Sequence, residues 1–300
     1  MPRAENWTIA DLLDFEYLLG EEKSGEEGAA SRDRAIFATE IAPHLPPARQ
    51  EDRRFIFKRW LASRRSSSPA TLPGQHYRSA WQALLTLAIL LGLSLGAGVA
   101  SGLLNYRGDE PVNVAWFFAA TVGVQWLLLL LAGALWLVRK LTGLLDDFRP
   151  LQALMGALLW AFNAGVRKLP GEKRESARAV MARITQRGEI YGAISPWPLL
   201  IATQLFGVCF NLGVLAALLL HVALTDVAFG WQSTLRTSPE EAFRLVSFLA
   251  QPWSFAPDAH PTLDQVVASR FAYSEGIRPL SQNAMASWWP FLCYAVLFYG

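Results

Sequence analysis

The segment most informative about the fold is VNVAWFFAATVGVQWLLLLLAGALWLVRK, residues 112–140. It contains no charged side chain from Val112 to Val138, and Arg139 and Lys140 then end it abruptly. An α-helix rises about 1.5 Å per residue, so about 20 apolar residues cross the roughly 30 Å hydrocarbon core of a bilayer. The sequence therefore predicts a transmembrane helix over residues 112–138.

Other apolar segments flank this one. Residues 80–106 precede it across a short turn, which predicts a helical hairpin, and residues 194–225 follow it as a third apolar window. Residues 287–300 are still apolar where the chain stops, but they are too few to cross a bilayer. We therefore expect three complete spans and the truncated start of a fourth.

The first expected span carries two pairs of glycines at a spacing of four, Gly92 with Gly96 and Gly98 with Gly102. Small residues at this spacing let the backbones of two helices approach closely in a membrane. Either pair is expected to permit close packing against another span.

Lysine and arginine are distributed unevenly among the hydrophilic segments. Residues 1–79 hold 12 and residues 139–189 hold 10, whereas residues 226–286 hold 4. Cytoplasmic segments carry the excess of basic residues, so the first two segments are expected in the cytoplasm and the third outside. Acidic residues come early in the chain, so no signal peptide is predicted and the first span acts as an uncleaved anchor.

The composition excludes several classes of protein. A formal net charge of +2 provides no global basic field of the kind on which sequence-independent nucleic-acid binding depends. The two cysteines, Cys209 and Cys293, cannot form a disulfide-rich scaffold. The predicted fold class is all-α, a polytopic helical membrane protein with small helical regions on the cytoplasmic and periplasmic sides. Its expected surroundings are the lipid bilayer, and no nucleic acid is expected among its partners.

The N-terminal region, residues 1–79, is predicted to be helical. Thr8-Ile-Ala-Asp11 resembles an N-cap at the start of a helix. Helices are expected at residues 8–20, 31–41 and 52–61, with a linker at residues 64–69. A region of this length barely forms an independent hydrophobic core. We therefore expect it to dock on the membrane-proximal helices or on a partner. A loosely ordered tail is the alternative.

The central segment, residues 139–189, has apolar residues at spacings of three and four, which predicts two amphipathic helices with basic residues on their other face. Two interpretations stay open. The segment is either a basic platform for anionic lipid or an acidic partner, or it shows only the usual basic excess beside a span.

The external segment, residues 226–286, contains two capping signals. Ser238-Pro-Glu-Glu241 and Thr262-Leu-Asp-Gln265 each combine an N-cap residue with Glu or Gln three positions later. Two short helices are therefore expected, the first ended by Pro252, and together they are expected to form a periplasmic cap over the membrane surface.

Motifs for catalysis or metal binding are missing from the sequence. It contains no phosphate-binding loop, dinucleotide-binding motif or nucleophile elbow, and its four histidines are far apart. We predict no catalytic, cofactor-binding or metal-binding residue, and hence no enzyme.

The polar residues inside the expected spans are Gln125, Gln204, Asn211 and His221. No Asp, Glu, Lys or Arg lies inside the three complete spans, which argues against a transporter or pump. The amides are expected to tie helices together, each contributing on the order of 1 kcal/mol. A polar path through the membrane near these four residues is the alternative.

A combination of short motifs runs along the chain: Asp14-Phe-Glu-Tyr17, Arg32-Asp-Arg34, Pro111-Val-Asn113, Gln204-Leu-Phe-Gly207, Phe210-Asn-Leu-Gly213, Phe229-Gly-Trp-Gln-Ser-Thr-Leu235, Ala268-Ser-Arg-Phe271 and Trp288-Trp-Pro-Phe291. In this combination the whole chain resembles a proteobacterial inner-membrane family of unknown function, the domain of unknown function 2868 type. The resemblance implies a multi-pass location in the bacterial inner membrane, with members longer than this chain. It also implies a neighbouring gene for an Era-like GTPase, and it supplies no active-site residues.

The leading hypothesis is an interaction or scaffold protein that recruits a cytoplasmic protein to the membrane. A GTPase is the partner class that the resemblance implies. The candidate interaction residues are Arg32, Arg34, Trp231, Gln232 and Arg270, although Trp231 also suits a purely structural place at the membrane interface. The alternative function is a channel or transporter subunit. Assembly of several copies is left open.

Overall fold

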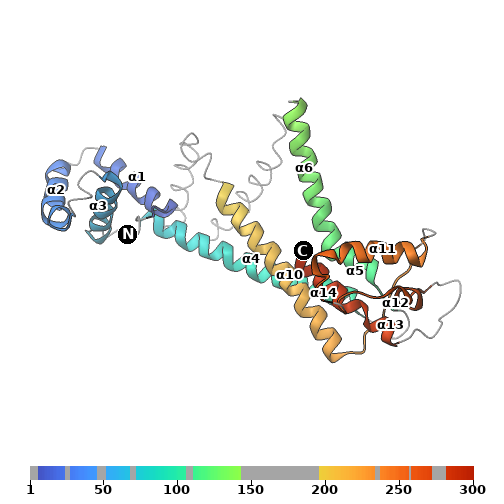
Figure 1. The fold of residues 1–300 in the computed structure, drawn as a ribbon. Helices are drawn as coiled ribbons and strands as arrows, with labels where there is room; N and C mark the ends of the chain where they lie inside the picture. Colours follow the sequence, from blue (N-terminus) through green and yellow to red (C-terminus); the bar gives the residue numbers. More distant parts are fainter. Residues whose placement is uncertain are drawn as a thin grey trace. The chain divides into compact units, whose positions relative to one another are not determined.

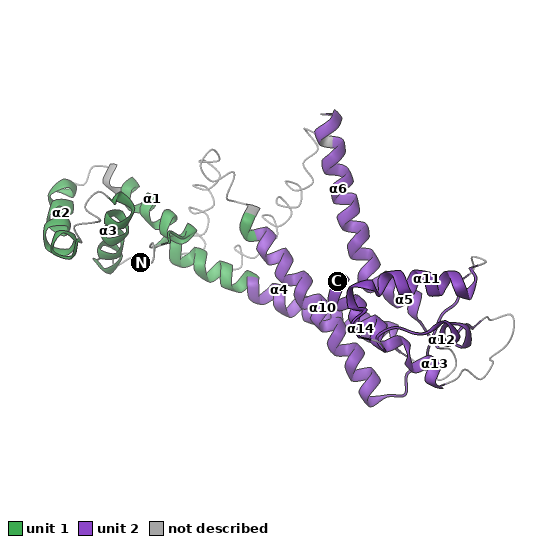
Figure 2. Cartoon of the chain, in the orientation of Figure 1, with its two compact units in different colours: residues 1–84, 151–198 green, residues 85–150, 199–300 purple. Residues whose placement is uncertain are grey.

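The computed structural model describes residues 6–23, 28–45, 52–67, 72–105, 111–142, 196–233, 237–256, 258–271 and 282–300, which are mostly helical. The chain divides into two compact units, residues 1–84 with 151–198 (unit 1) and residues 85–150 with 199–300 (unit 2), shown in Figure 2. The amphipathic helices expected over residues 139–189 lie outside the described residues from residue 143 onward.

Unit 1 contains a small helical domain at the beginning of the chain (Figure 1). Its elements are α1 (Ile9–Lys23), α2 (Ala29–Ile36), the π turn η1 (Phe37–Ile41), the 3₁₀ turn η2 (Ala42–His44), α3 (Arg53–Ser67) and the first turns of α4 (Pro73–Leu103). Its buried core consists of Leu18, Ile36, Ile41, Trp60, Leu61 and Leu72. Leu72 directly precedes α4, so the domain packs on the beginning of that helix, as expected for a region too small to stand alone.

The sequence predicted the start of α1 correctly but not the end of α3. Thr8 Oγ1 accepts a hydrogen bond from the Asp11 N–H at 3.2 Å, and the Asp11 carboxylate accepts one from the Thr8 N–H at 3.0 Å, which confirms the expected N-cap. The linker predicted at residues 64–69 is wrong as far as Ser67, because α3 continues to that residue. Its last turns are held by Arg65, which pairs with carboxylates of α1.

Within the described ranges, three helical segments are long and apolar enough to cross a membrane: Pro73–Leu103, Val114–Thr142 and Trp197–Leu224. The first is α4. The second consists of α5 (Val114–Phe118), the π turn η4 (Ala119–Gly123) and α6 (Val124–Thr142), and the third is α10 (Pro196–Leu224). The Asn113 side chain accepts a hydrogen bond from the Ala115 N–H at 3.0 Å and so begins the second segment.

Glycines bring α4 and α10 into backbone contact in unit 2. A Cβ added at Gly92 would lie 2.6 Å from the Phe206 carbonyl oxygen, and one added at Gly96 would collide with the Phe210 carbonyl. Gly213 of α10 meets the backbone of α4 in the same way. Of the two glycine pairs in α4, only Gly92 and Gly96 face α10, since a Cβ at Gly98 or Gly102 would meet nothing within 4 Å.

The external segment begins with a short parallel pairing. β1 (Val112–Asn113) pairs with β2 (Phe229–Gly230), with Val112 opposite Phe229. The remaining elements are α11 (Pro239–Leu249), the 3₁₀ turn η5 (Gln251–Trp253), α12 (Leu263–Ala268), α13 (Gln282–Ala286) and α14 (Trp288–Tyr299). Both expected capping boxes are formed, at the starts of α11 and α12. The β1–β2 pairing joins the start of the second candidate span to the residues that follow the third.

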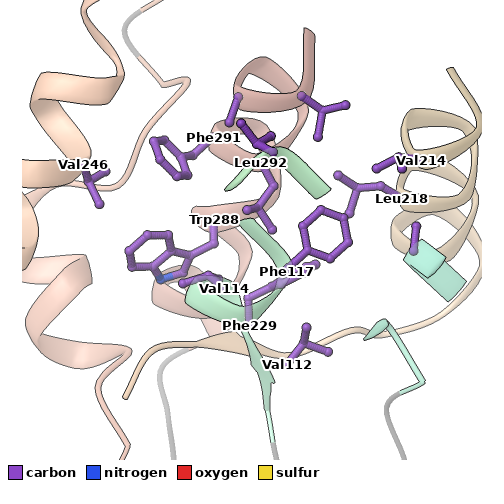
Figure 3. Close-up of a cluster of buried hydrophobic side chains, with 14 of the residues drawn as sticks. Val112, Val114, Phe117, Val214, Leu218, Phe229, Val246, Trp288, Phe291 and Leu292 are labelled. Carbon is purple, nitrogen blue, oxygen red and sulfur yellow. The ribbon is translucent and has the colours of Figure 1, made fainter. Parts of the chain in front are cut away.

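The external segment and the spans of unit 2 share one hydrophobic core (Figure 3). Phe117 from the second span, Val214 and Leu218 from the third, and Trp288 and Leu292 from α14 are all nearly fully buried in it. Val246 of α11 belongs to the same core. The described part of residues 226–286 is therefore built into the same core as the candidate spans of unit 2.

Candidate functional site

A buried polar site lies in unit 1 between α1, α3 and the start of α4. We call it the carboxylate junction, and it consists of Asp11, Asp14, Arg65, Gly74 and Arg78. The Asp14 residue is 1% exposed and Asp11 is 4% exposed. Arg65 donates from Nη1 to Asp11 Oδ1 at 2.7 Å and from Nε to Asp14 Oδ2 at 2.8 Å. Arg78 adds a longer bond to Asp11 at 3.3 Å. The two buried carboxylates thus share one forked guanidinium.

Asp14 also caps the first candidate span. Its Oδ1 accepts a hydrogen bond from the Gly74 N–H, in the first turn of α4, at 2.5 Å. The first N–H groups of a helix have no partner within the helix and carry partial positive charge, so a carboxylate is favourable there. A Cβ at position 74 would lie 2.6 Å from Asp14 Oδ2, so glycine makes this approach sterically possible. The junction therefore couples the helical domain to the start of α4.

The pKa of Asp11 lies below its ordinary value. Burial by itself disfavours the charged carboxylate, but hydrogen bonds from Thr8 and Arg65, with the Arg65 charge, outweigh that effect. Because the folded-state pKa of Asp11 is lower than the unfolded one, ionised Asp11 stabilises the domain at neutral pH. That contribution is lost as the pH falls below about 4 and through the folded-state pKa.

We therefore expect acid to destabilise unit 1 partly through Asp11. The difference in unfolding midpoint between the wild type and Asp11→Asn should be largest near pH 7. It should shrink as the pH falls below about 4 and through the lowered folded-state pKa of Asp11, below which both side chains are neutral. Thermal unfolding of the solubilised protein across this pH range measures it. A difference that stays constant with pH would show that the Asp11 charge makes no contribution.

A second polar site lies between α6 and α10 in unit 2. Gln125 Nε2 donates to Asn211 Oδ1 at 2.8 Å, and Asn211 Nδ2 donates back to Gln125 Oε1 at 3.5 Å. Gln125 follows the π turn η4 and also donates to the Thr121 carbonyl at 2.6 Å, while Thr121 Oγ1 donates to the Phe117 carbonyl at 2.7 Å. Both bonds are made to backbone carbonyls of the same helical segment, next to the π turn. The amide pair links the second and third spans.

Removing either amide is expected to weaken this link. A double-mutant cycle of Gln125→Leu and Asn211→Leu should give a coupling free energy of about 1 kcal/mol, the scale measured for interhelical hydrogen bonds in membranes. Gln204→Leu is the matched control, because Gln204 is an exposed amide on the same helix as Asn211. Additive effects in the cycle would mean that the two amides do not interact.

The other two polar span residues are not part of this pair. Gln204 is exposed, and the His221 Nδ1 lies 2.9 Å from the Ala217 carbonyl oxygen of its own helix. The structure therefore brings two of the four polar residues together and leaves Gln204 and His221 apart from them.

The external candidate residues lie around β2. Trp231 is buried, 6% exposed, and its Nε1 donates to the Val266 carbonyl at 2.7 Å. The exposed Arg270 guanidinium covers the Trp231 ring, with its Cζ 5.4 Å from the ring centroid, and Gln232 is half-buried beside them. Trp231 therefore belongs to the shared hydrophobic core of unit 2, while Arg270 provides the accessible surface over it.

The N-terminal candidates lie on α2. Arg32 is half-buried and its Nε lies 3.8 Å from Asp33 Oδ1, and Arg34 is exposed in the last turn. Asp33 in turn accepts a hydrogen bond from Trp60 Nε1 at 3.0 Å, which ties α2 to α3. Of the two arginines, Arg34 is the more accessible to a partner. Among the described residues no group of three or more His, Cys, Asp or Glu side chains could hold a metal ion.

Fold and sites together define a helical protein with three segments suited to crossing a membrane. Residues 165–300 match the model of a family described as protein of unknown function (DUF2868), so this part of the chain is similar to that family. The resemblance is thereby confirmed over residues 165–300, and the motifs near Asp14, Arg32 and Pro111 lie outside the match. No curated protein and no solved structure matches the chain in the comparisons made.

Proposed function

We propose that the chain is a multi-pass protein of the bacterial inner membrane that holds a cytoplasmic partner at the membrane surface. Its N-terminus lies in the cytoplasm, and residues 1–79 and 139–189 form the docking region. The distribution of basic residues supports this orientation, since these two segments carry most of the lysine and arginine. The partner class is a GTPase, because such a protein is often encoded beside members of the family that the chain resembles.

The observation that carries the proposal is the carboxylate junction. It fixes a folded helical domain to the beginning of α4 through two buried carboxylates, a shared arginine and a helix cap. A partner bound to this domain is fixed to the start of the first candidate span, which a loosely ordered tail does not achieve. The exposed arginines of the domain suit an acidic partner surface: Arg34, Arg53, Arg54 and Arg59.

Co-purification from membranes in mild detergent tests the proposal. The wild-type chain should retain the neighbouring GTPase, and a variant with Arg34, Arg53, Arg54 and Arg59 changed to Glu should lose at least about tenfold in retention, equivalent to about 1.4 kcal/mol. Arg244→Glu, an exposed arginine of the external segment, is the matched control and should behave as the wild type. If the GTPase keeps its membrane association and its activity when the chain is deleted, the proposal is rejected.

The alternative, a channel or transporter subunit, has less support from the geometry. Gln125 and Asn211 hydrogen-bond to each other, so their polar groups serve helix packing. Liposome flux with Asn211→Leu as the comparison decides this alternative, and equal permeability of both proteins rejects it. We also propose no catalytic activity for the chain.

A further inference from the structure

The amide pair of unit 2 marks the middle of the membrane-spanning segments. Asn211 lies near the middle of Trp197–Leu224, and Gln125 lies near the middle of Val114–Thr142. On α4, Gly96 contacts Phe210 next to Asn211, and it lies within the apolar stretch of that helix. At about 1.5 Å rise per residue, this level lies about 20 Å from Leu224 on α10, about 17 Å from Val114 on the second segment and about 11 Å from Leu103 on α4.

The end of α14 lies at this level. Trp126 Nε1 donates to the Tyr299 carbonyl at 3.1 Å, and the two rings pack edge to face with centroids 5.0 Å apart. A Cβ added at Gly300 would lie 2.7 Å from Asn211 Oδ1. Helix α14 therefore starts at Trp288, in the shared hydrophobic core of unit 2, and reaches the level of the amide pair at Tyr299.

The end of α11 is tied to the same place. The Tyr299 hydroxyl donates to the Leu249 carbonyl at 2.9 Å, and the Trp253 ring of η5 packs against the Tyr299 ring at 5.7 Å and stacks on Tyr294 at 5.8 Å. Figure 1 shows α11 ending beside the C-terminus. Leu249 and Trp253 therefore contact the side chain of Tyr299, whose backbone lies at the level of the amide pair.

The beginning of α11 carries charged side chains, which suit the outer end of the spans. Its first turn carries the exposed Glu240 and Glu241, and α11 packs against α12, whose Val266 accepts the hydrogen bond from Trp231 next to β2. The 11 residues of α11 extend about 16 Å, which is enough to run from that end towards the middle of the spans. No residue between Arg244 and Asp258 carries a charge.

Large apolar side chains are exposed along the inner part of this segment. Leu245 is 59% exposed, Phe248 63% and Phe255 72%, fractions similar to those of the leucines that α6 exposes at residues 127–131. The backbone at the turn is hydrogen-bonded within the protein, because the Ala250 N–H donates to the Val246 carbonyl at 2.9 Å and Leu249 accepts from Tyr299. Non-helical backbone is tolerated at membrane depth when it is satisfied in this way.

We propose that α11 and η5 form a re-entrant segment, which enters the outer leaflet and returns, with Leu245, Phe248 and Phe255 in contact with lipid acyl chains. The partner of this apolar surface is therefore the bilayer interior. A cap on the membrane surface would leave the same three side chains in water, which is unfavourable for large apolar groups. The proposal rests on the membrane insertion proposed above.

Spin labels test the depth directly. Single cysteines are placed at Glu240, Phe248, Phe255 and Leu130 in a full chain with Cys209 and Cys293 replaced by alanine, labelled with a nitroxide and reconstituted in phosphatidylethanolamine–phosphatidylglycerol vesicles. We expect labels 248 and 255 to collide mainly with oxygen, as label 130 on α6 does, and label 240 to collide mainly with a water-soluble nickel chelate. Leu245→Cys serves as a second variant on the same face if labelling at 248 disturbs the fold.

The outcomes separate this inference from the proposed function. Nickel-accessible labels at 248 and 255 beside an oxygen-accessible label at 130 would overturn the re-entrant segment and leave the membrane insertion intact. Labels at 248 and 255 that neither reagent reaches would overturn it as well, by showing a protein contact. A nickel-accessible label at 130 would overturn the membrane insertion itself and the re-entrant segment with it.

Discussion

The substitution Gly96→Leu is expected to lower the thermal unfolding midpoint of the solubilised protein strongly, whereas Gly98→Leu should leave it almost unchanged. At position 96 even a Cβ collides with the Phe210 carbonyl, which belongs to the backbone of α10 and cannot rotate away. The two helices must separate, so the contacts of Gly92 and Gly213 are lost together. Over-packing typically costs about 1–3 kcal/mol, and we expect the upper end or more because backbone is displaced.

Gly98→Leu is the matched control for Gly96→Leu. Gly98 lies on the same helix, receives the same side chain and has nothing within 4 Å of its added Cβ. Gly213→Leu probes the same contact from α10 and should resemble Gly96→Leu. The measurements are the unfolding midpoint and the fraction of protein that elutes as a single folded species. Equal midpoints for Gly96→Leu and Gly98→Leu would contradict the observed packing of α4 on α10.

The glycine pairs illustrate what a sequence can predict. Both pairs in α4 have the same spacing, and nothing local distinguishes Gly92 and Gly96 from Gly98 and Gly102. Apolar length identified the helices, and capping boxes identified the starts of α11 and α12, because those signals depend on neighbouring residues alone. The face that one helix presents to another depends on both helices, so the structure was needed to choose the pair.

The carboxylate junction was missed for a related reason. Asp11 and Asp14 are spaced three apart on α1, which is also the pattern of an ordinary solvated acidic face. Their partner Arg65 lies more than 50 positions along the chain, in a stretch whose serines and arginines suggested a linker. For Trp231 the sequence left a structural place and an interaction role open, since the hydrogen bond to the Val266 carbonyl depends on a residue 35 positions away.

Removing the Asp14 carboxylate is expected to unfold the N-terminal domain while leaving the spans of unit 2 folded. In Asp14→Ala, the Arg65 guanidinium loses one of its two carboxylates and the Gly74 N–H loses its acceptor. Breaking a buried ion pair by removing one partner costs about 3–5 kcal/mol, and the partial exposure of Arg65 favours the lower end. Domains are stable by only about 5–15 kcal/mol, and this one is small, so trypsin should cut residues 6–67 much faster in the variant.

Two further variants separate charge from helix capping. Asp14→Asn keeps a side-chain oxygen for the Gly74 N–H but loses the charge that pairs with Arg65, so it should destabilise the domain less than Asp14→Ala does. Glu40→Ala, at an exposed carboxylate in the same domain, should digest like the wild type. If Asp14→Ala also digested like the wild type, the junction would not hold the domain together. A partner that depends on this domain should be lost from the membrane with Asp14→Ala and retained with Glu40→Ala, which links the stability of the junction to the proposed docking function.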